Sequence, residues 1–552
     1  MFRMLPARVW HPLLLLLASA VLYLPNLGTP SLWDIDEGNN VEAAREMQER
    51  QDLVVPQFNY QLRVDKPALL YWLQIAAFRV FGVNEFAGRL PSALAATGAV
   101  LLVYVLGRRA MSASAGLLAA LVLATATLFT AAAHFANPDA LLNLFTTWTL
   151  FWFWRGVAEG QRSWFILAGI SSGLAVLAKG PVGLVLPSAV AGLFLLWSGR
   201  LRLLLDRRLA WGALAFALVA VPWYALVGAE TRLEWLKGFF LVHNLGRFHA
   251  PMEGHHGPVY YYVAVLILGL IPWSVFLGPA VWCSLRLLWK RGPAPAEAPE
   301  PVDFQRFLWC WLGVYLVFFS CSGTKLPNYI LPAYAPVALL IGQFLDFWRR
   351  GEIALPSWVM NGCLLLLGLV GGGLALGLAI AAGVVSFAFM HGHYVPGVQW
   401  YGVLGAIPIV GALAAAVYVR AGRRNAAMLS LGLSAVALIG GLAAGGPCAV
   451  DRYKAPRPLA EALRRRVTEP DIRVGCYECF EPSLVFYCRR EVARLETAAA
   501  AVQFLRTPLP AYVFVPATLW ERMANSAPAA CRLVDRHYDL YRNCDVMLIS
   551  NR

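Results

Sequence analysis

Charged residues are scarce in this chain of 552 residues. Asp, Glu, Lys and Arg make up only 14% of it, and 32 residues are acids. Apolar types fill 59% of the chain, with 20 Trp, 20 Tyr and 29 Phe, which is more than the core of one water-soluble domain can hide. The composition therefore excludes an ordinary soluble enzyme or binding module and predicts a polytopic membrane protein.

Apolar runs long enough to cross about 30 Å of hydrocarbon as helices recur along the chain. We count thirteen, which start near Val9, Phe86, Ala113, Pro138, Ser163, Pro181, Leu209, Pro258, Phe307, Leu326, Trp358, Tyr401 and Ala426. For the first run a signal peptide is the alternative, because Ala18-Ser19-Ala20 resembles a cleavage site, although the apolar stretch continues to Leu24. The predicted fold is a polytopic α-helical membrane protein with about 13 transmembrane helices.

Basic residues are nearly absent from every second connection between these runs. If the amino terminus is cytoplasmic, pairs such as Arg108-Arg109 and Arg349-Arg350 lie inside, whereas the short outer connections hold only Lys179 and Lys325. The net charge of +14 therefore follows largely from topology. It gives no support to nucleic-acid binding.

The polar residues gather on the predicted outer face. A transmembrane domain over residues 1–447 carries outer loops at 28–85 and 228–257, and residues 448–552 form a tail. In the first loop, residues 39–50 are predicted to form an amphipathic helix and residues 66–80 a half-apolar segment, and both are predicted to lie along the membrane surface. The tail is predicted to be a small periplasmic α/β domain, with strands at 472–477, 483–488, 511–516 and 545–550 and helices at 458–467 and 498–505.

Cysteines are concentrated in the tail, which holds six of the ten. Outside the cytoplasm they can form disulfides, whose connectivity the sequence does not give. Cys476 and Cys479 also have the spacing of a zinc or redox pair. Without a second such pair, the indication of a metal is weak.

Three carboxylates, Asp34, Asp36 and Glu37, follow the first apolar run in the stretch LWDIDEGNN. Asp36 precedes a predicted helix, so it could simply cap the helix amino terminus. Asp139, in HFANPDALLNL, lies at the outer end of another apolar run, where capping is again the alternative. A charge next to hydrocarbon nevertheless favours a functional role, and the predicted topology places these acids on one side.

Four cations open onto the same side as the acids: Lys66, Lys179, Arg247 and Lys325. Each lysine alone could place its ammonium at the membrane interface with no further role. Gathered beside acids, they indicate an anionic group near the membrane surface, since phosphate esters are held by point charges and guanidinium donors. A neighbouring carboxylate could then activate an attacking hydroxyl.

An ordered set of motifs now resembles a known family. WDIDEG, VDKPALLYW, NPDALLNL, LAKGPVGLVLP, HNLGRF, HHGPVYYY with IPW, and SGTKLPNYILP are similar to motifs of the polyprenyl-phosphate-sugar-dependent glycosyltransferases of the GT-C superfamily. The resemblance is strongest to the lipid A aminoarabinose transferases and weaker to the protein O-mannosyltransferases. It covers residues 32–336 closely and the rest by architecture.

The resemblance implies a role for each motif residue. Asp36 would be the catalytic carboxylate, Asp139 a second acid and Glu37 a supporting one. Lys66, Lys179 and Lys325 would bind the donor phosphate, with Arg247 and Tyr329 as further candidates. A divalent metal, the only cofactor implied, would lie between Asp65 and His256 or His255. The family usually reads DExRY and Glu-Lys-Pro where this chain has residues 36–40 and Asp65-Lys66-Pro67.

The implied activity is inverting transfer of a monosaccharide from undecaprenyl phosphate, a polyprenyl carrier, to lipid A or another envelope glycolipid. It would take place at the periplasmic face of the bacterial inner membrane. A protein or polysaccharide glycosyltransferase of the same superfamily is the alternative. A lipid transporter or flippase would more typically show internal repeats and charges near the midplane, which we do not find. A scaffold without catalytic activity would leave the acids and lysines unexplained.

Overall fold

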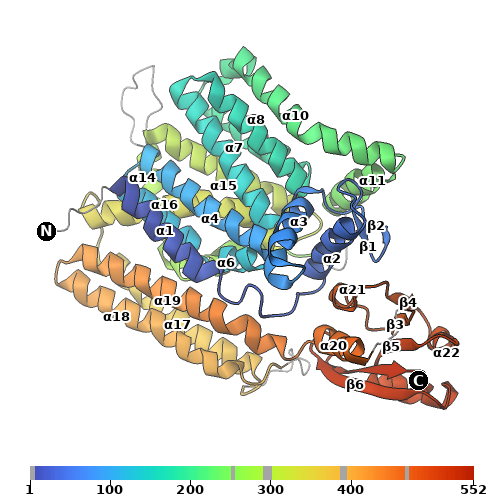
Figure 1. Cartoon of the computed structure of the whole chain (residues 1–552). Helices are drawn as coiled ribbons and strands as arrows, with labels where there is room; N and C mark the ends of the chain where they lie inside the picture. The colour runs from blue at the N-terminus through green and yellow to red at the C-terminus, as the bar shows by residue number, and fades with distance from the viewer. Residues whose placement is uncertain (1–6, 250–254, 290–300, 386–393, 467–470) are drawn as a thin grey trace.

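The computed structural model describes residues 7–249, 255–289, 301–385, 394–466 and 471–552. Its larger part is a bundle of apolar helices (Figure 1). The helices of the bundle are α1 (Ala7–Tyr23), α4 (Glu85–Ala110), α5 (Ala113–Ala124), α6 (Thr127–His134), α7 (Asp139–Glu159), α8 (Arg162–Lys179), α9 (Val182–Trp197), α10 (Arg207–Glu230), α13 (Tyr261–Gly269), α14 (Leu277–Trp289), α15 (Pro301–Cys321), α16 (Tyr334–Arg350), α17 (Ser357–Ala381), α18 (Ala406–Arg420) and α19 (Arg424–Asp451). Short 3-10 segments join some of them: η1 (Leu201–Leu205), η3 (Trp273–Phe276), η4 (Pro327–Ala333) and η6 (Val398–Gly405).

Each of the thirteen predicted runs contains a helix of this bundle. Within the described residues, seven helices are long and apolar enough to cross a membrane, and nine if two bent pairs each count as one span. Four further apolar helices, α1, α3, α8 and α9, are shorter. The chain is a multi-pass membrane protein, and thirteen spans remain a prediction.

Helix α16 lies at the centre of the bundle. The share of its apolar stretch that is buried is 94%, against 22% for α17 and 28% for α18. Helices α17, α18 and α19 lie side by side as an outer layer, and α19 leads to the carboxy-terminal domain (Figure 1). Helix α19 continues to Asp451, beyond the domain boundary predicted after residue 447.

The two predicted outer loops carry short elements. The first contains α2 (Asp36–Glu49), a hairpin of β1 (Gln57–Phe58) and β2 (Gln61–Leu62), and α3 (Leu69–Phe81). The second contains α11 (Glu234–Lys237), a wider helical turn η2 (Gly238–Gly246) and α12 (Arg247–His249). The predicted helix at 39–50 corresponds to α2, and the half-apolar segment at 66–80 contains most of α3.

The carboxy-terminal domain is a five-stranded sheet with helices. Its elements are α20 (Pro456–Arg466), β3 (Arg473–Tyr477), α21 (Pro482–Cys488), β4 (Ala493–Leu495), α22 (Ala498–Leu505), β5 (Ala511–Pro516), α23 (Ala517–Met523), η7 (Ala524–Ser526), β6 (Arg532–Asp539) and β7 (Cys544–Ser550). The strand order is β4-β3-β5-β7-β6, parallel from β4 to β5 and antiparallel beyond. Three of the four predicted strands are confirmed, but residues 483–488 form helix α21.

All ten cysteines lie in the described residues, and none of them forms a disulfide in this structure. The sulfur atoms of Cys476 and Cys479 are 2.8 Å apart and buried. No group of three His, Cys, Asp or Glu side chains that could bind a metal occurs within the residues that the structure describes.

Candidate active site

Asp36 is the first residue of α2, and its side chain is exposed. The residue at the N-cap position is Ile35, which makes no side-chain cap, so the capping interpretation of Asp36 is not what the structure shows. The nearest polar partner of the carboxylate is Asn137, whose amide Nδ2 lies 3.5 Å from Oδ2. Asp36 is therefore an open acceptor.

Asp139, two residues after Asn137, begins α7 and is buried. It forms an ion pair with Lys179, the last residue of α8, and its Oδ2 accepts a hydrogen bond of 2.8 Å from Asn328. The Lys179 ammonium lies 5.0 Å from the ring centroid of Tyr329. Asp139 thus does not act as a helix cap, and α7, α8 and η4 bring three of the predicted site residues together.

A second group surrounds Asp65. The buried Arg63 forms an ion pair with it. Nη2 donates to Oδ2 at 2.9 Å, and Nε lies 2.7 Å from Oδ1, which accepts no hydrogen bond from the described residues. Arg63 also donates to Asn40 Oδ1 at 3.0 Å and to the Tyr71 hydroxyl at 3.1 Å. Burial disfavours the charged Asp65 carboxylate, but Arg63, followed by Lys66 and His243, holds its pKa below the usual value.

The metal that the resemblance implies does not fit these residues. Both oxygens of Asp65 already contact the Arg63 guanidinium, and a cation there would have to displace or repel that charge. His243 acts on Asp65 electrostatically. His255 and His256 are exposed, and the backbone carbonyl of His255 accepts a hydrogen bond from Lys325 N. We therefore route no chemistry through a metal.

The remaining predicted cations differ in their partners. Lys66 is half-buried and makes no hydrogen bond or salt bridge with any residue that the structure describes. The Lys325 ammonium is buried and donates to the carbonyls of Ser320 and Ser322, at the end of α15. Arg247 begins α12, and its carbonyl accepts a hydrogen bond from Thr324 N, so the second outer loop is joined to the strand-like segment before η4.

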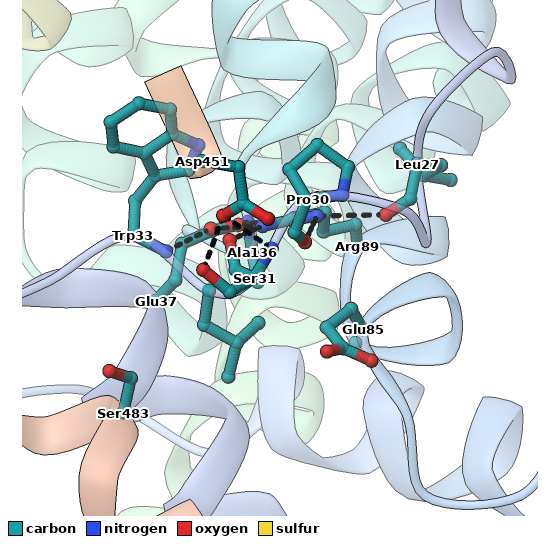
Figure 2. Close-up of polar contacts among 12 residues, drawn as sticks. Leu27, Pro30, Ser31, Trp33, Glu37, Glu85, Arg89, Ala136, Asp451 and Ser483 are labelled. Carbon is teal, nitrogen blue, oxygen red and sulfur yellow. Dashed lines mark hydrogen bonds and ion pairs between the residues drawn. The ribbon is translucent and has the colours of Figure 1, made fainter. Parts of the chain in front are cut away.

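Glu37, predicted as a supporting acid, is fully buried and forms a bidentate pair with Arg89 of α4. The distances are 2.7 Å from Arg89 Nη2 to Oε2 and 2.9 Å from Nε to Oε1. Its oxygens also accept the backbone N–H groups of Trp33 and Ala136 (Figure 2). Arg89 donates in addition to the carbonyls of Leu27, Pro30 and Ser31. The pair therefore joins the Asp36 loop to the segment that carries Asn137 and Asp139.

Asp34 faces the carboxy-terminal domain instead of the Asp139 cluster. Its carboxylate accepts hydrogen bonds from the backbone N–H of Ser483, at 2.7 Å, and from the Ser483 hydroxyl. Burial raises the pKa of Asp34 to about 7, although Ser483 and Lys454 oppose the shift and Glu37 adds to it. Burial and the Asp34 charge raise the pKa of Glu481 to about 8, although the nearby Arg542 acts to lower it.

These shifts predict a pH dependence of stability. Because the folded protein favours the neutral forms of Asp34 and Glu481, their contribution is present at low pH and is lost as the pH rises through about 7 to 8. We expect the melting temperature of the wild type to fall relative to that of Asp34→Asn, which stays neutral, between about pH 4 and pH 8. Exposed Asp535→Asn is the control. Parallel curves for wild type and Asp34→Asn would contradict the assignment.

A family model described as dolichyl-phosphate-mannose-protein mannosyltransferase matches residues 65–225. An undecaprenyl phosphate-alpha-4-amino-4-deoxy-L-arabinose arabinosyl transferase from Pseudomonas aeruginosa is 34% identical over 60% of this chain and 59% of its own length. An uncharacterised protein from Aquifex aeolicus is 32% identical over 60% of this chain and 72% of its own.

A solved structure is similar over nearly the whole chain. The crystal structure of ArnT from Cupriavidus metallidurans bound to undecaprenyl phosphate has a TM-score of 0.81 at 22% identity, covering 99% of both chains. The architecture is thus that of GT-C membrane proteins, an expectation from the motifs that is confirmed. In sequence, the chain is similar to the undecaprenyl phosphate-aminoarabinose arabinosyl transferases. It spans about three fifths of the length of the curated arabinosyl transferases that it matches.

Three residues of the site are absent from those predicted from the motifs. Arg63, Arg89 and Asn328 engage Asp65, Glu37 and Asp139, respectively. Asn328 does lie within the motif SGTKLPNYILP, and Arg63 two residues before Asp65, so proximity in sequence was a usable signal for both. Arg89 is 52 residues from Glu37, and no local pattern connects the two.

Proposed function

We propose that this protein transfers a monosaccharide from an undecaprenyl phosphate carrier to lipid A or another envelope glycolipid, with inversion at the anomeric carbon. The observation that carries the proposal is the meeting of Asp36 with Asn137, beside the cluster of Asp139, Lys179 and Tyr329. An open carboxylate close to a lysine ammonium is an arrangement suited to such a donor, because the ammonium can contact the phosphate. The names of the arabinosyl transferase relatives and the carrier bound to ArnT support the same substrate class.

In the proposed reaction an acceptor oxygen attacks the anomeric carbon opposite the phosphate. The new bond to the acceptor forms while the bond from carbon to the phosphate oxygen breaks, and the electron pair leaves with the carrier phosphate. If the acceptor is a hydroxyl, its proton passes to Asp36. If it is an already ionised phosphate, Asp36 has no proton to take and only orients the acceptor. The cations stabilise the charge that grows on the leaving phosphate.

The lysines contribute unequally in this proposal. Lys66 has no salt bridge or hydrogen bond among the described residues, so we assign it first to the donor phosphate. Lys179 would exchange part of its contact with Asp139 for the donor, and Lys325 acts mainly through the end of α15. Arg247 and Tyr329 stay candidates for the same phosphate.

The chain departs from the family motif at residues 39 and 40, where Asn39 and Asn40 stand in place of the expected arginine and tyrosine. Asn40 instead receives a hydrogen bond from Arg63, which brings a guanidinium to this turn. The negative charge of Asp36 also acts on Arg63. We propose that Arg63 supplies the local positive charge that the motif lacks, while it remains paired with Asp65.

In this proposal the protein lies in the bacterial inner membrane, with the active site and the carboxy-terminal domain on the periplasmic side. That location matches the flipped, membrane-anchored donor, since no nucleotide sugar is available there. Topology reporters fused after Arg552 would test the side of the tail.

The experiment that tests the function combines purified protein and intact cells. Proteoliposomes would receive an undecaprenyl-phosphate-linked sugar together with lipid A, a periplasmic protein extract or envelope polysaccharide, each in a separate reaction. We expect modified lipid A or glycolipid by mass spectrometry, and loss of the same species from cells without the gene. Modification of only the protein or the polysaccharide would instead assign the chain to the alternative transferase class.

Lys66→Ala should weaken use of the donor. Loss of a charge-assisted hydrogen bond to a partly desolvated phosphate costs about 1.5–3 kcal/mol, or roughly 10- to 150-fold in kcat/KM for the donor. Arg79→Ala, which removes an exposed cation from α3, is the matched control and should stay within about two-fold of wild type. Unchanged donor dependence in Lys66→Ala would return this lysine to an interfacial role.

A further inference from the structure

The loop that precedes the proposed catalytic carboxylate is held along its length by the end of α19 and by the carboxy-terminal domain. Ser31 N donates to Asp451 Oδ1 at 2.9 Å, and the Lys454 ammonium donates to the carbonyl of Ser31, also at 2.9 Å. Leu32 N donates to the Tyr487 hydroxyl at 2.8 Å. These contacts connect residues more than 400 positions apart in the chain.

The contact nearest to Asp36 is made by Asp34. Its two oxygens accept the backbone N–H and the hydroxyl of Ser483, at the start of α21, and its own N–H donates to the Tyr541 hydroxyl at 3.2 Å. Below we call the Asp34 and Ser483 contact the clasp. The side chain of Ser483 is buried, so water competes little for these hydrogen bonds.

Close backbone packing reinforces the clasp on the other side of Asp36. Helix α2 packs against α21, and a Cβ atom at Gly38 would lie 2.4 Å from Ser483 N and 2.6 Å from Asp34 Oδ1. Only glycine leaves room for this approach. Residues 34 and 38 are therefore both fixed against α21, and Asp36 lies between them.

We propose that the carboxy-terminal domain positions Asp36 for sugar transfer through the clasp, which makes Asp34 and Ser483 positioning residues of the reaction. This inference rests on the proposed function and adds a role for a domain that contributes none of the predicted site residues. Asp34 belongs to the acid cluster singled out in the sequence, and the transfer chemistry itself does not use it.

The physical reason lies in the freedom of Asp36. Its exposed side chain has one long contact, to Asn137, so the backbone of residues 34–38 determines where the carboxylate points. A displacement of about 1 Å in a reacting group can cost about 10²-fold in rate. Tyr487, Lys454 and Asp451 would keep the domain docked when the clasp is removed, because they contact residues 31 and 32. Removing the clasp should therefore change the orientation of the Asp36 carboxylate and leave the fold intact.

The test compares three variants of the full-length protein in proteoliposomes with an undecaprenyl-phosphate-linked sugar. Asp34→Ala and Ser483→Ala should lower kcat by about 10- to 100-fold, while the KM for the donor, set by the cations, stays within about three-fold of wild type. Asp34→Asn should retain most of the rate, since its amide can still accept from Ser483 N–H and donate to the Ser483 hydroxyl. Ser526→Ala, in η7 of the same domain, is the control.

A readout without catalysis separates the clasp from the proposed function. Hydrogen–deuterium exchange over residues 31–38 should speed up in Asp34→Ala and Ser483→Ala and stay near wild type in Asp34→Asn. If the wild type has no transferase activity but the variants show this pattern of exchange, the positioning role and the proposed function are both overturned. The clasp would then remain only as a contact that docks the domain. Two results with active wild-type protein would overturn the positioning role alone. One is an unchanged kcat in Asp34→Ala. The other is a Ser483→Ala variant that loses its fold, so that kcat and the KM for the donor both deteriorate.

Discussion

Asp36→Asn should lower the transfer rate by about 10²-fold or more while the protein still folds and inserts into the membrane. The substitution keeps the shape of the side chain and removes the charge that accepts a proton or orients the acceptor. Asp36 is exposed at the start of α2 and bears no cap or salt bridge in the described structure, so its loss should leave the fold unchanged. The measurement is kcat with an undecaprenyl-phosphate-linked sugar in proteoliposomes.

The matched control is Glu49→Gln at the other end of α2. Glu49 pairs with Arg45 on the outside of the helix and lies far along it from the proposed site, so its substitution should change the rate by less than about two-fold. Near-normal turnover of Asp36→Asn would remove Asp36 from the mechanism. In that case Asp139, which is paired with Lys179, would be the remaining carboxylate at the cluster.

The helices of the bundle could be predicted from the sequence because hydrocarbon imposes a long apolar run on each of them. Strands β3, β5 and β7 could also be predicted, because each is a short, largely buried apolar run. Residues 483–488 were wrongly predicted as a strand. A short run that is apolar throughout has no periodicity to distinguish helix from strand. Here Pro482 occupies the first helical turn, and Asp34 accepts the amide of Ser483, so a contact 449 residues away helps to begin the helix.

The candidate site was predictable to the extent that motifs carry it. Asp139, Lys179 and Tyr329 come from three separate motifs, and the structure brings them into contact. Their partners were harder to predict, because a carboxylate in a sequence does not say which cation it will meet. Lys179 is predicted to bind the donor phosphate, and the motifs give no sign of its ion pair with Asp139. The motif VDKPALLYW likewise gives no sign that Asp65 pairs with Arg63.

The environment of Glu37 could not be predicted from the sequence either. Two positions of one acidic stretch, residues 36 and 37, differ completely in environment: Asp36 is exposed, whereas Glu37 is fully buried. A helix separates consecutive residues by about 100° around its axis, so one faces the outer surface and the next faces α4. The exposed Asp36 is accessible to a substrate. The Glu37 carboxylate instead has a structural role, because it accepts hydrogen bonds from the backbone N–H groups of Trp33 and Ala136 (Figure 2).

Arg89→Ala should therefore destabilise the protein by about 3–5 kcal/mol, the cost of leaving a buried charge without its partner. Arg89 is 2% exposed and Glu37 is 0% exposed, so little water can replace the lost guanidinium. Three backbone carbonyls, of Leu27, Pro30 and Ser31, would lose their donor as well. Unfolding of the detergent-solubilised protein by SDS, followed by circular dichroism, would measure the change.

Arg465→Ala provides the contrast, because Arg465 is 81% exposed and lies 3.8 Å from Glu461. An exposed pair of this kind contributes about 0–1 kcal/mol, so the two arginine variants should differ clearly in stability. Glu37→Gln should fall between them, since the amide keeps one acceptor for the N–H groups of Trp33 and Ala136 but leaves Arg89 without a counter-charge. If Arg89→Ala were no less stable than Arg465→Ala, the pair could not be what fixes the Asp36 loop against α4. The positions of Asp36 and Asn137 would then have to be maintained from the carboxy-terminal side, through Asp34 and Ser483.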